Sequence, residues 1–110
     1  MKKINIVRDS NDFERAIKKG KRISNQHYYN NIVSNENEYY RFGISVGKKI
    51  SNKAVIRNKL KRQLKSIIDN HKNLYQNHQD YIIIMKRNCL ESNYQELEAS
   101  FLNIMNKIQK

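Results

Sequence analysis

The stretch of sequence that decides the fold is GISVGKKISNKAVIRNKLKRQLKSII, residues Gly43–Ile68. It predicts the end of a strand, a polar turn and a long helix. In the helical part, apolar residues recur about every four positions, which is typical of a helix that packs one face on a core. Ser51 or Asn52 is the expected N-cap, because a short polar side chain can accept a hydrogen bond from a free backbone N–H. The apolar residues are Ile56, Leu60, Leu64 and Ile68, with Val55 and Ile67 beside them.

The same stretch carries a concentrated positive charge. Nine basic residues and no acidic residue lie between Arg41 and Ile68, in a chain of 110 residues with a formal net charge of +12. Like charges at helical spacing repel by roughly 0.2–0.5 kcal/mol a pair, so stability alone does not favour this arrangement. Clustered cations attract a polyanion and release its counterions, which predicts an RNA-binding surface. The candidate RNA-binding residues are Lys48, Lys49, Lys53, Arg57, Asn58, Lys59, Lys61, Arg62 and Lys65.

A merely solvated face and a membrane-bound face both fit the basic helix less well. A solvated lysine-rich face usually mixes charges of both signs, and this face does not. A helix that lies on a membrane surface usually carries Trp or Phe on its apolar side, and the stripe from Ile56 to Ile68 has neither. Strands are expected on either side of the helix, which also indicates that this stripe packs on a core.

The length and composition fit one RNA-binding domain over residues 1–110. No apolar run is long enough to span a membrane, and the first residues are too short and polar a segment for a secretory signal, so we expect a cytoplasmic protein. The single cysteine, Cys89, excludes an internal disulfide and is expected to be a small semi-buried residue after a strand.

Two further helices are expected near the ends of the chain. The first covers residues 10–19, with Ser10 or Asn11 as its cap. The last follows a capping-box pattern made by Ser92 and Gln95. Its apolar side is expected to be core, and consists of Tyr94, Leu97, Phe101, Ile104, Met105 and Ile108.

Three strands complete the predicted fold, over residues 26–33, 39–46 and 81–85. The last is a short continuous apolar run, which fits a strand buried on both faces. The first mixes tyrosine and asparagine, which is unusual for a core face but suits contact with an RNA strand. The predicted order is αββαβα, an α/β (α+β) two-layer sandwich.

Two segments resemble the protein component of bacterial ribonuclease P. These are FGISVGKK at residues 42–49 and AVIRNKLKR at residues 54–62. In that family a strand ends in paired basic residues and leads to a helix with an Arg-Asn-Arg-x-x-Lys-Arg core. Lys59 stands here in place of the third arginine of the core, and Lys65 stands where an arginine is common. The resemblance implies a ribosomal protein S5 domain 2-like fold with a left-handed βαβ crossover, whereas spacing alone predicts a right-handed one.

The resemblance also implies a function. A protein of this family binds the catalytic ribonuclease P RNA and the 5′ leader of precursor tRNA, and it promotes removal of the leader. It is expected to be a monomer in a one-to-one complex with the RNA, with no protein partner required. The RNA subunit and its Mg²⁺ ions perform the hydrolysis, so the protein itself is expected to bind no cofactor. The residues expected to border the leader cleft are Phe13, Ile17, Tyr29 and Asn31.

The residues themselves give no sign of an intrinsic active site. His27, His71 and His78 lack metal-ligand spacing and are each expected on the surface or in a loop. The three glycines do not form a phosphate-binding loop. We therefore predict no catalytic residue and no metal ligand. The main alternative is a structural RNA-binding protein of ribosomal type. A DNA-binding regulator is a weaker one, because nothing in the sequence suggests a dimer.

Overall fold

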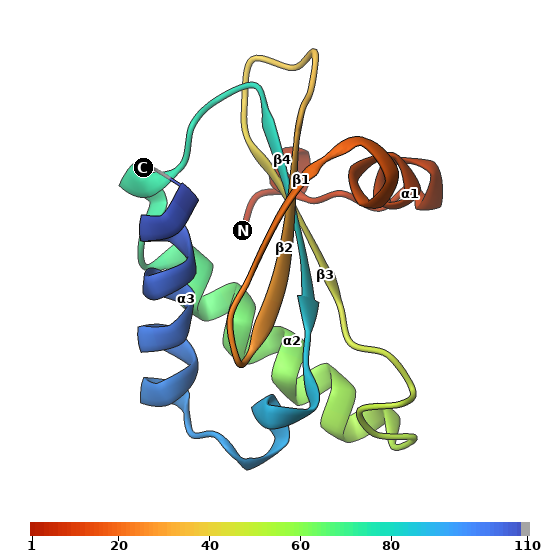
Figure 1. Cartoon of the computed structure of the whole chain (residues 1–110), viewed down its shortest axis with the longest axis vertical. Coiled ribbons are helices and arrows are strands. Elements are labelled where there is room, and N and C mark those ends of the chain that lie inside the picture. Colours follow the sequence, from red (N-terminus) through yellow and green to blue (C-terminus); the bar gives the residue numbers. More distant parts are fainter. Residues whose placement is uncertain (109–110) are drawn as a thin grey trace.

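The computed structural model describes residues 1–108. Within this range, three α-helices and four strands follow one another in the order α1-β1-β2-β3-α2-β4-α3 (Figure 1). Short 3₁₀ turns lie at Lys3–Asn5, Lys72–Leu74 and Arg87–Glu91. The bounds are α1 Ser10–Lys19, β1 Lys21–Ser24, β2 Tyr28–Ser34, β3 Arg41–Ser45, α2 Ala54–Asp69, β4 Gln79–Met85 and α3 Tyr94–Ile108.

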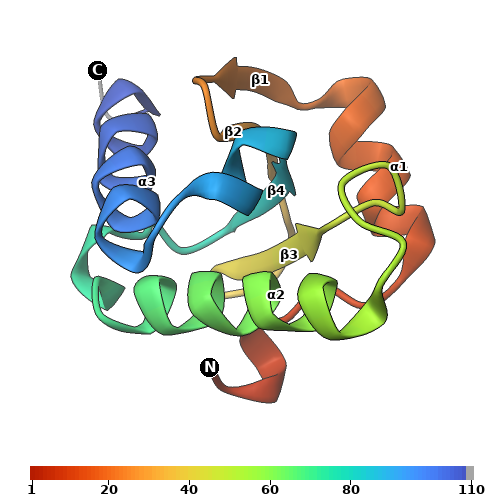
Figure 2. The same cartoon turned by 90° about the horizontal axis from the view of Figure 1, so that it is seen from below.

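The strands form one mixed sheet in the spatial order β1-β2-β4-β3. Strand β2 pairs antiparallel with β1 and β4, whereas β3 pairs parallel with β4, so the chain must cross over from β3 to β4 through α2. Helices α2 and α3 pack on one face of the sheet, and α1 covers part of the other face (Figure 2). The α/β class predicted from the sequence is confirmed.

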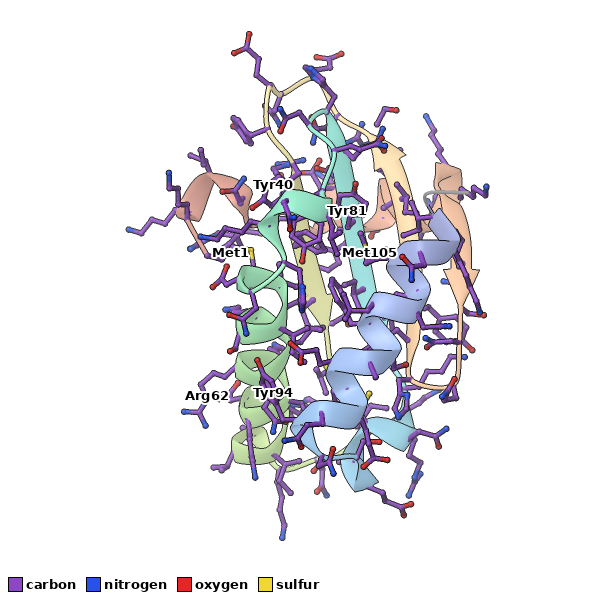
Figure 3. The ribbon with its side chains drawn as sticks, turned by 90° about the vertical axis from the view of Figure 1, so that its left-hand side faces the viewer. Met1, Tyr40, Arg62, Tyr81, Tyr94 and Met105 are labelled. Carbon is purple, nitrogen blue, oxygen red and sulfur yellow. The ribbon has the colours of Figure 1, made fainter. Side chains whose placement is uncertain are left out.

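The main core lies between the sheet and the pair α2 and α3. Phe42 stands near its centre, with the ring centroids of Tyr75 and Tyr81 4.7 and 4.9 Å away. The apolar sides expected for the two helices are confirmed, except for Val55. At the start of α3, the hydroxyl of Tyr94 lies 2.9 Å from Oγ of Ser66 and joins α3 to α2 (Figure 3).

Strand β4 is buried on both faces, as its apolar run predicts. Tyr81, Ile83 and Met85 belong to the main core, while Ile82 packs with Ala16 of α1 on the opposite face. Successive side chains of a strand point to opposite faces, so an apolar run without alternation requires a covering layer on each side. Helix α1 supplies the second layer over only part of the sheet.

The predicted order αββαβα is wrong in one element, because it lacks strand β1. This strand has four residues and only one large apolar side chain, Ile23, so it carries almost no periodic signal. It forms because β2 offers it a ladder from Lys21↔Ile32 to Ser24↔Tyr29. The other strands lie within two residues of their predicted bounds.

Helix α1 has its predicted bounds, but the residues that cap the helices differ from the predicted ones. Asp9 caps α1, where its Oδ1 accepts a hydrogen bond from the backbone N–H of Asn11 at 2.9 Å. Helix α2 begins after Lys53, which makes no side-chain cap bond. Helix α3 has a capping box made by Asn93 and Glu96, one residue beyond the predicted pair. Several polar side chains near the start of each helix could serve as the N-cap, and the backbone geometry determines which one does.

Three predicted burials need correction. Val55 is 77% exposed on α2 instead of facing the core. His27 is buried, with its two ring nitrogens 2.8 Å from Oγ of Ser92 and of Ser100. Cys89 is fully buried, and this burial raises the pKa of its thiol to about 11. The sequence around each of these three residues does not show which other elements its side chain contacts.

Replacing Leu64 by alanine should lower the free energy of unfolding by about 2–5 kcal/mol, because the side chain is fully buried in the main core. Val55→Ala on the same helix is the matched control and should change it by less than about 0.5 kcal/mol, because Val55 is exposed. Denaturant unfolding followed by circular dichroism measures both values. Equal losses would contradict the described packing of α2.

Candidate nucleic-acid interface

The candidate RNA-binding residues of α2 and of the loop before it form the basic surface of α2, and no ion pair neutralises it in the part of the chain that the structure describes. Within residues 1–108, ion pairs involve the cationic groups of Met1, Arg15, Arg41 and His71 only. None involves a candidate RNA-binding residue of α2 or of the loop before it. Their positive charges are therefore available to a partner, which is the condition that the sequence-based hypothesis requires.

Local contacts arrange this basic surface. The guanidinium of Arg57 donates a hydrogen bond from Nη1 to the backbone oxygen of Ser51 at 2.8 Å, which ties the loop before α2 to its first turn. Arg62 points away from α3 into solvent (Figure 3). A shallow depression along the helix is lined by Val55, Asn58, Lys61, Arg62 and Lys65. Exposed Val55 thus belongs to the basic surface rather than to the core.

Arg41 does not belong to this surface, although it opens the basic stretch of the sequence. Its Nε and Nη2 donate to the two carboxylate oxygens of Asp80 at 2.8 and 2.7 Å. The hydrogen bond to Asp80 raises the pKa of Arg41 above its ordinary value. Arg15 and Asn35 also donate to the Asp80 carboxylate. Asp80 is fully buried, so this cluster neutralises its charge and fastens α1 to the sheet.

The second candidate surface is the sheet face on the side of α1. The strand register places three rows of residues across it. Val33, Asp80 and Arg41 form the row at α1, Arg22, Asn31, Ile82 and Gly43 form the middle row, and Ser24, Tyr29, Ile84 and Ser45 form the row farthest from α1. In Figure 1 the uncovered part of this face lies between α1 and the loop that leads into α2.

The four residues predicted for the leader cleft all belong to this side of the molecule. Phe13 packs against Gly43 and Ile82, and Ile17 of the same helix is 47% exposed. Tyr29 is half-buried and Asn31 is buried, on adjacent rows of β2. The structure therefore places the four on the same side of the sheet, and their contact with RNA remains a prediction.

Sequence reasoning missed two cations at the same place. Arg22 donates from Nε to Oδ1 of Asn31 at 2.9 Å, and Lys86 lies over the ring of Tyr29. Recognition of β1 as a strand would have revealed Arg22, because the residue that pairs with Asn31 shares its face. Lys86 follows β4 and carried no such signal.

The histidines and carboxylates do not form a metal centre in the described chain. Among residues 1–108, no group of three His, Cys, Asp or Glu side chains lies close enough to hold a metal ion. His71 pairs with Glu98 at 3.1 Å, and His78 is exposed. In the same part of the chain, none of the helices has the length and apolar character needed to cross a membrane.

The mixed sheet, with an uncompensated basic helix beside an uncovered face, defines a small nucleic-acid-binding protein of the α/β class. A family model described as Ribonuclease P matches residues 1–109. The chain therefore belongs to the family of ribonuclease P protein components, and the family recognised from residues 42–62 is confirmed.

Related proteins match over nearly their whole length. The ribonuclease P protein component of Streptococcus agalactiae is 32% identical over 105 residues, which are 96% of this chain and 94% of the relative. That of Bacillus cereus is 32% identical over 108 residues, 97% of this chain and 93% of the relative. The solved structure of the Staphylococcus aureus RNase P protein is 30% identical, with a TM-score of 0.86, over 96% of this chain and 95% of that one. The Thermotoga maritima protein is 28% identical, with a TM-score of 0.83, over 92% and 94%.

Gly43→Ala should displace Phe13 and loosen α1, because an added Cβ would lie 2.7 Å from Cζ of Phe13 and 2.8 Å from Cδ1 of Ile82. We expect a loss of about 1–3 kcal/mol in unfolding free energy, measured by denaturant titration. Gly47→Ala is the matched control, because its added Cβ would meet nothing closer than 3.9 Å. A larger loss for Gly47→Ala than for Gly43→Ala would contradict the packing of α1.

Proposed function

We propose that the chain acts in ribonuclease P by binding the RNA subunit and the 5′ leader of precursor tRNA. The observation that carries this proposal is the basic surface of α2 and its preceding loop, where no carboxylate pairs with any candidate residue within residues 1–108. Neutralisation of several phosphates by such a surface releases counterions and gives strong, salt-dependent affinity. Family membership supports the identity of the RNA partners.

The two surfaces have separate roles in this proposal. The candidate residues of α2 and its loop bind RNA phosphates, with Arg57 and Arg62 able to offer paired N–H donors and the lysines acting as point charges. The uncovered sheet face, bordered by Phe13, Ile17 and Tyr29, receives the unpaired leader. Single-stranded RNA suits such a face, because its bases offer both flat surfaces and polar edges.

Hydrolysis is assigned in this proposal to the RNA subunit, which uses Mg²⁺, and the protein contributes binding alone. The proposed particle is cytoplasmic and contains one copy of this chain for each RNA, without a further protein. The proposed hand of the β3-α2-β4 crossover is left, as in the ribosomal protein S5 domain 2-like fold. The parallel pairing of β3 and β4 supports a crossover there.

Reconstitution with a ribonuclease P RNA tests the function. The chain should restore accurate leader cleavage of precursor tRNA at low Mg²⁺, where the RNA alone is slow. A structural RNA-binding protein of ribosomal type, or a DNA-binding protein, would not restore it. Failure of the wild-type chain in this assay would contradict the proposal.

Arg62→Ala should weaken the affinity for ribonuclease P RNA and reduce the slope of log K against log salt by about 0.7–0.9, the share of one phosphate. Lys72→Ala is the matched control, because it also removes one exposed charge but lies outside the predicted set. Filter binding across a salt series measures both slopes. An unchanged slope for Arg62→Ala would exclude this side chain from the interface.

A further inference from the structure

Tyr29 lies between two cations on the uncovered part of the sheet. Cζ of Arg22 is 4.6 Å from the centroid of the Tyr29 ring, and Nζ of Lys86 is 4.2 Å from it. Arg22 pairs with Asn31 in the strand register, whereas the backbone N–H of Lys86 bonds to the carbonyl oxygen of His27. Asn31 and His27 lie on either side of Tyr29 along the chain, so the two cations come from positions that flank Tyr29 in the sheet.

Only neutral groups hold these cations in place. Nε of Arg22 donates to Oδ1 of Asn31 at 2.9 Å, and Nζ of Lys86 donates to the backbone oxygen of Asn25 at 2.6 Å. Neither forms an ion pair in the part of the chain that the structure describes. Attraction to an aromatic ring, worth about 0.5–1 kcal/mol at an exposed site, supplies no counter-charge. The pair therefore suits an anion.

A second observation points to a ligand at the same place. The side chain of Asn31 is 1% exposed, and its Nδ2 has no hydrogen-bond partner within residues 1–108. An unpaired buried donor costs about 1–3 kcal/mol, so stability does not explain its position. This amide belongs to the side chain to which Arg22 is hydrogen-bonded, so a ligand held by Arg22 would lie beside a neutral donor.

We propose that Arg22 and Lys86, positioned by the ring of Tyr29, form a binding site for a phosphate of the single-stranded leader. The inference rests on the proposed function, which brings the leader onto this face. Arg22 comes from β1, the ring of Tyr29 from β2, and Lys86 from the residue that follows β4. Arg22 lies three strand spacings from β3, roughly 14 Å, whereas Lys86 follows the strand next to β3, so the proposed site continues the positive surface across the sheet. Tyr29 then holds cations instead of presenting a free face to a base.

The test compares Arg22→Gln with Lys21→Gln in the reconstituted holoenzyme. Lys21 is the neighbouring exposed cation on β1, and it pairs with Ile32 on the opposite face of the sheet. Arg22→Gln should weaken binding of leader-bearing precursor tRNA about three- to tenfold and reduce the salt slope by about 0.7. Lys21→Gln should leave both at the wild-type values. Binding of mature tRNA, which has no leader, should not distinguish the two variants.

Each outcome bears on one part of the inference. Equal behaviour of Arg22→Gln and Lys21→Gln would overturn it. If Arg22→Gln weakened the binding of mature tRNA, or of ribonuclease P RNA alone, by the same factor, the phosphate that Arg22 contacts would belong to that RNA. This result would overturn the leader assignment. Failure of the wild-type chain to promote cleavage contradicts the proposed function itself, and it is seen before any variant is compared.

A conservative variant separates binding from folding. Arg22→Lys keeps the charge and loses the planar guanidinium, so it should retain the wild-type salt slope while losing part of the affinity. Thermal unfolding of Lys21→Gln should stay within about 2 °C of wild type because Lys21 is exposed, whereas disturbance of the hydrogen bond to buried Asn31 should lower the unfolding temperature of the Arg22 variants by several degrees, so binding is measured where all three are folded. A salt slope for Arg22→Lys as low as that of Arg22→Gln would contradict a phosphate contact.

Discussion

The buried carboxylate of Asp80 is the constraint on which the placement of the other elements depends. It is fully buried at the start of β4, so its charge must be compensated from within the protein. The donors come from three separate segments: Arg15 of α1, Asn35 after β2 and Arg41 of β3. This one carboxylate therefore joins α1 to one end of the sheet. Because α1 is only ten residues long, it cannot also cover the other end, which stays open.

Several acidic side chains have partners elsewhere in the molecule, which helps to explain why the basic surface is uncompensated. Asp12 joins Arg15 and Arg41 in the Asp80 cluster, and Asp69 at the end of α2 pairs with the N-terminal ammonium group. Glu96 completes the capping box of α3. Each of these carboxylates has a partner that lies away from the polar side of α2. The segregation of charge thus follows from local structural roles of these carboxylates.

Most of the fold could be predicted from the sequence because the main core has strong periodic patterns. The helical stripes of α2 and α3 and the apolar run of β4 each specify a burial that the structure confirms. Strand β1 could not be predicted, since it forms only because β2 provides a paired edge and the side chain of Asn25 accepts two backbone hydrogen bonds in the turn. The candidate site could likewise be predicted only in part. The basic helix is visible in a linear pattern, whereas the cations around Tyr29 come together only through the register of β1, β2 and β4.

The strand directions explain why positive charge gathers at one end of the uncovered face. Strands β3 and β4 are parallel, so the loop that carries Lys48 and Lys49 leaves the sheet at the same end as Lys86. Strand β2 runs antiparallel to β4, which brings the β1–β2 turn to that end as well. The opposite end holds Asp80 and Asp12, paired with arginines and covered by α1. The face therefore has a positive end and a neutralised end. A polyanion that enters it meets a field set by the topology of the sheet, and single substitutions change the strength of this field more readily than its direction.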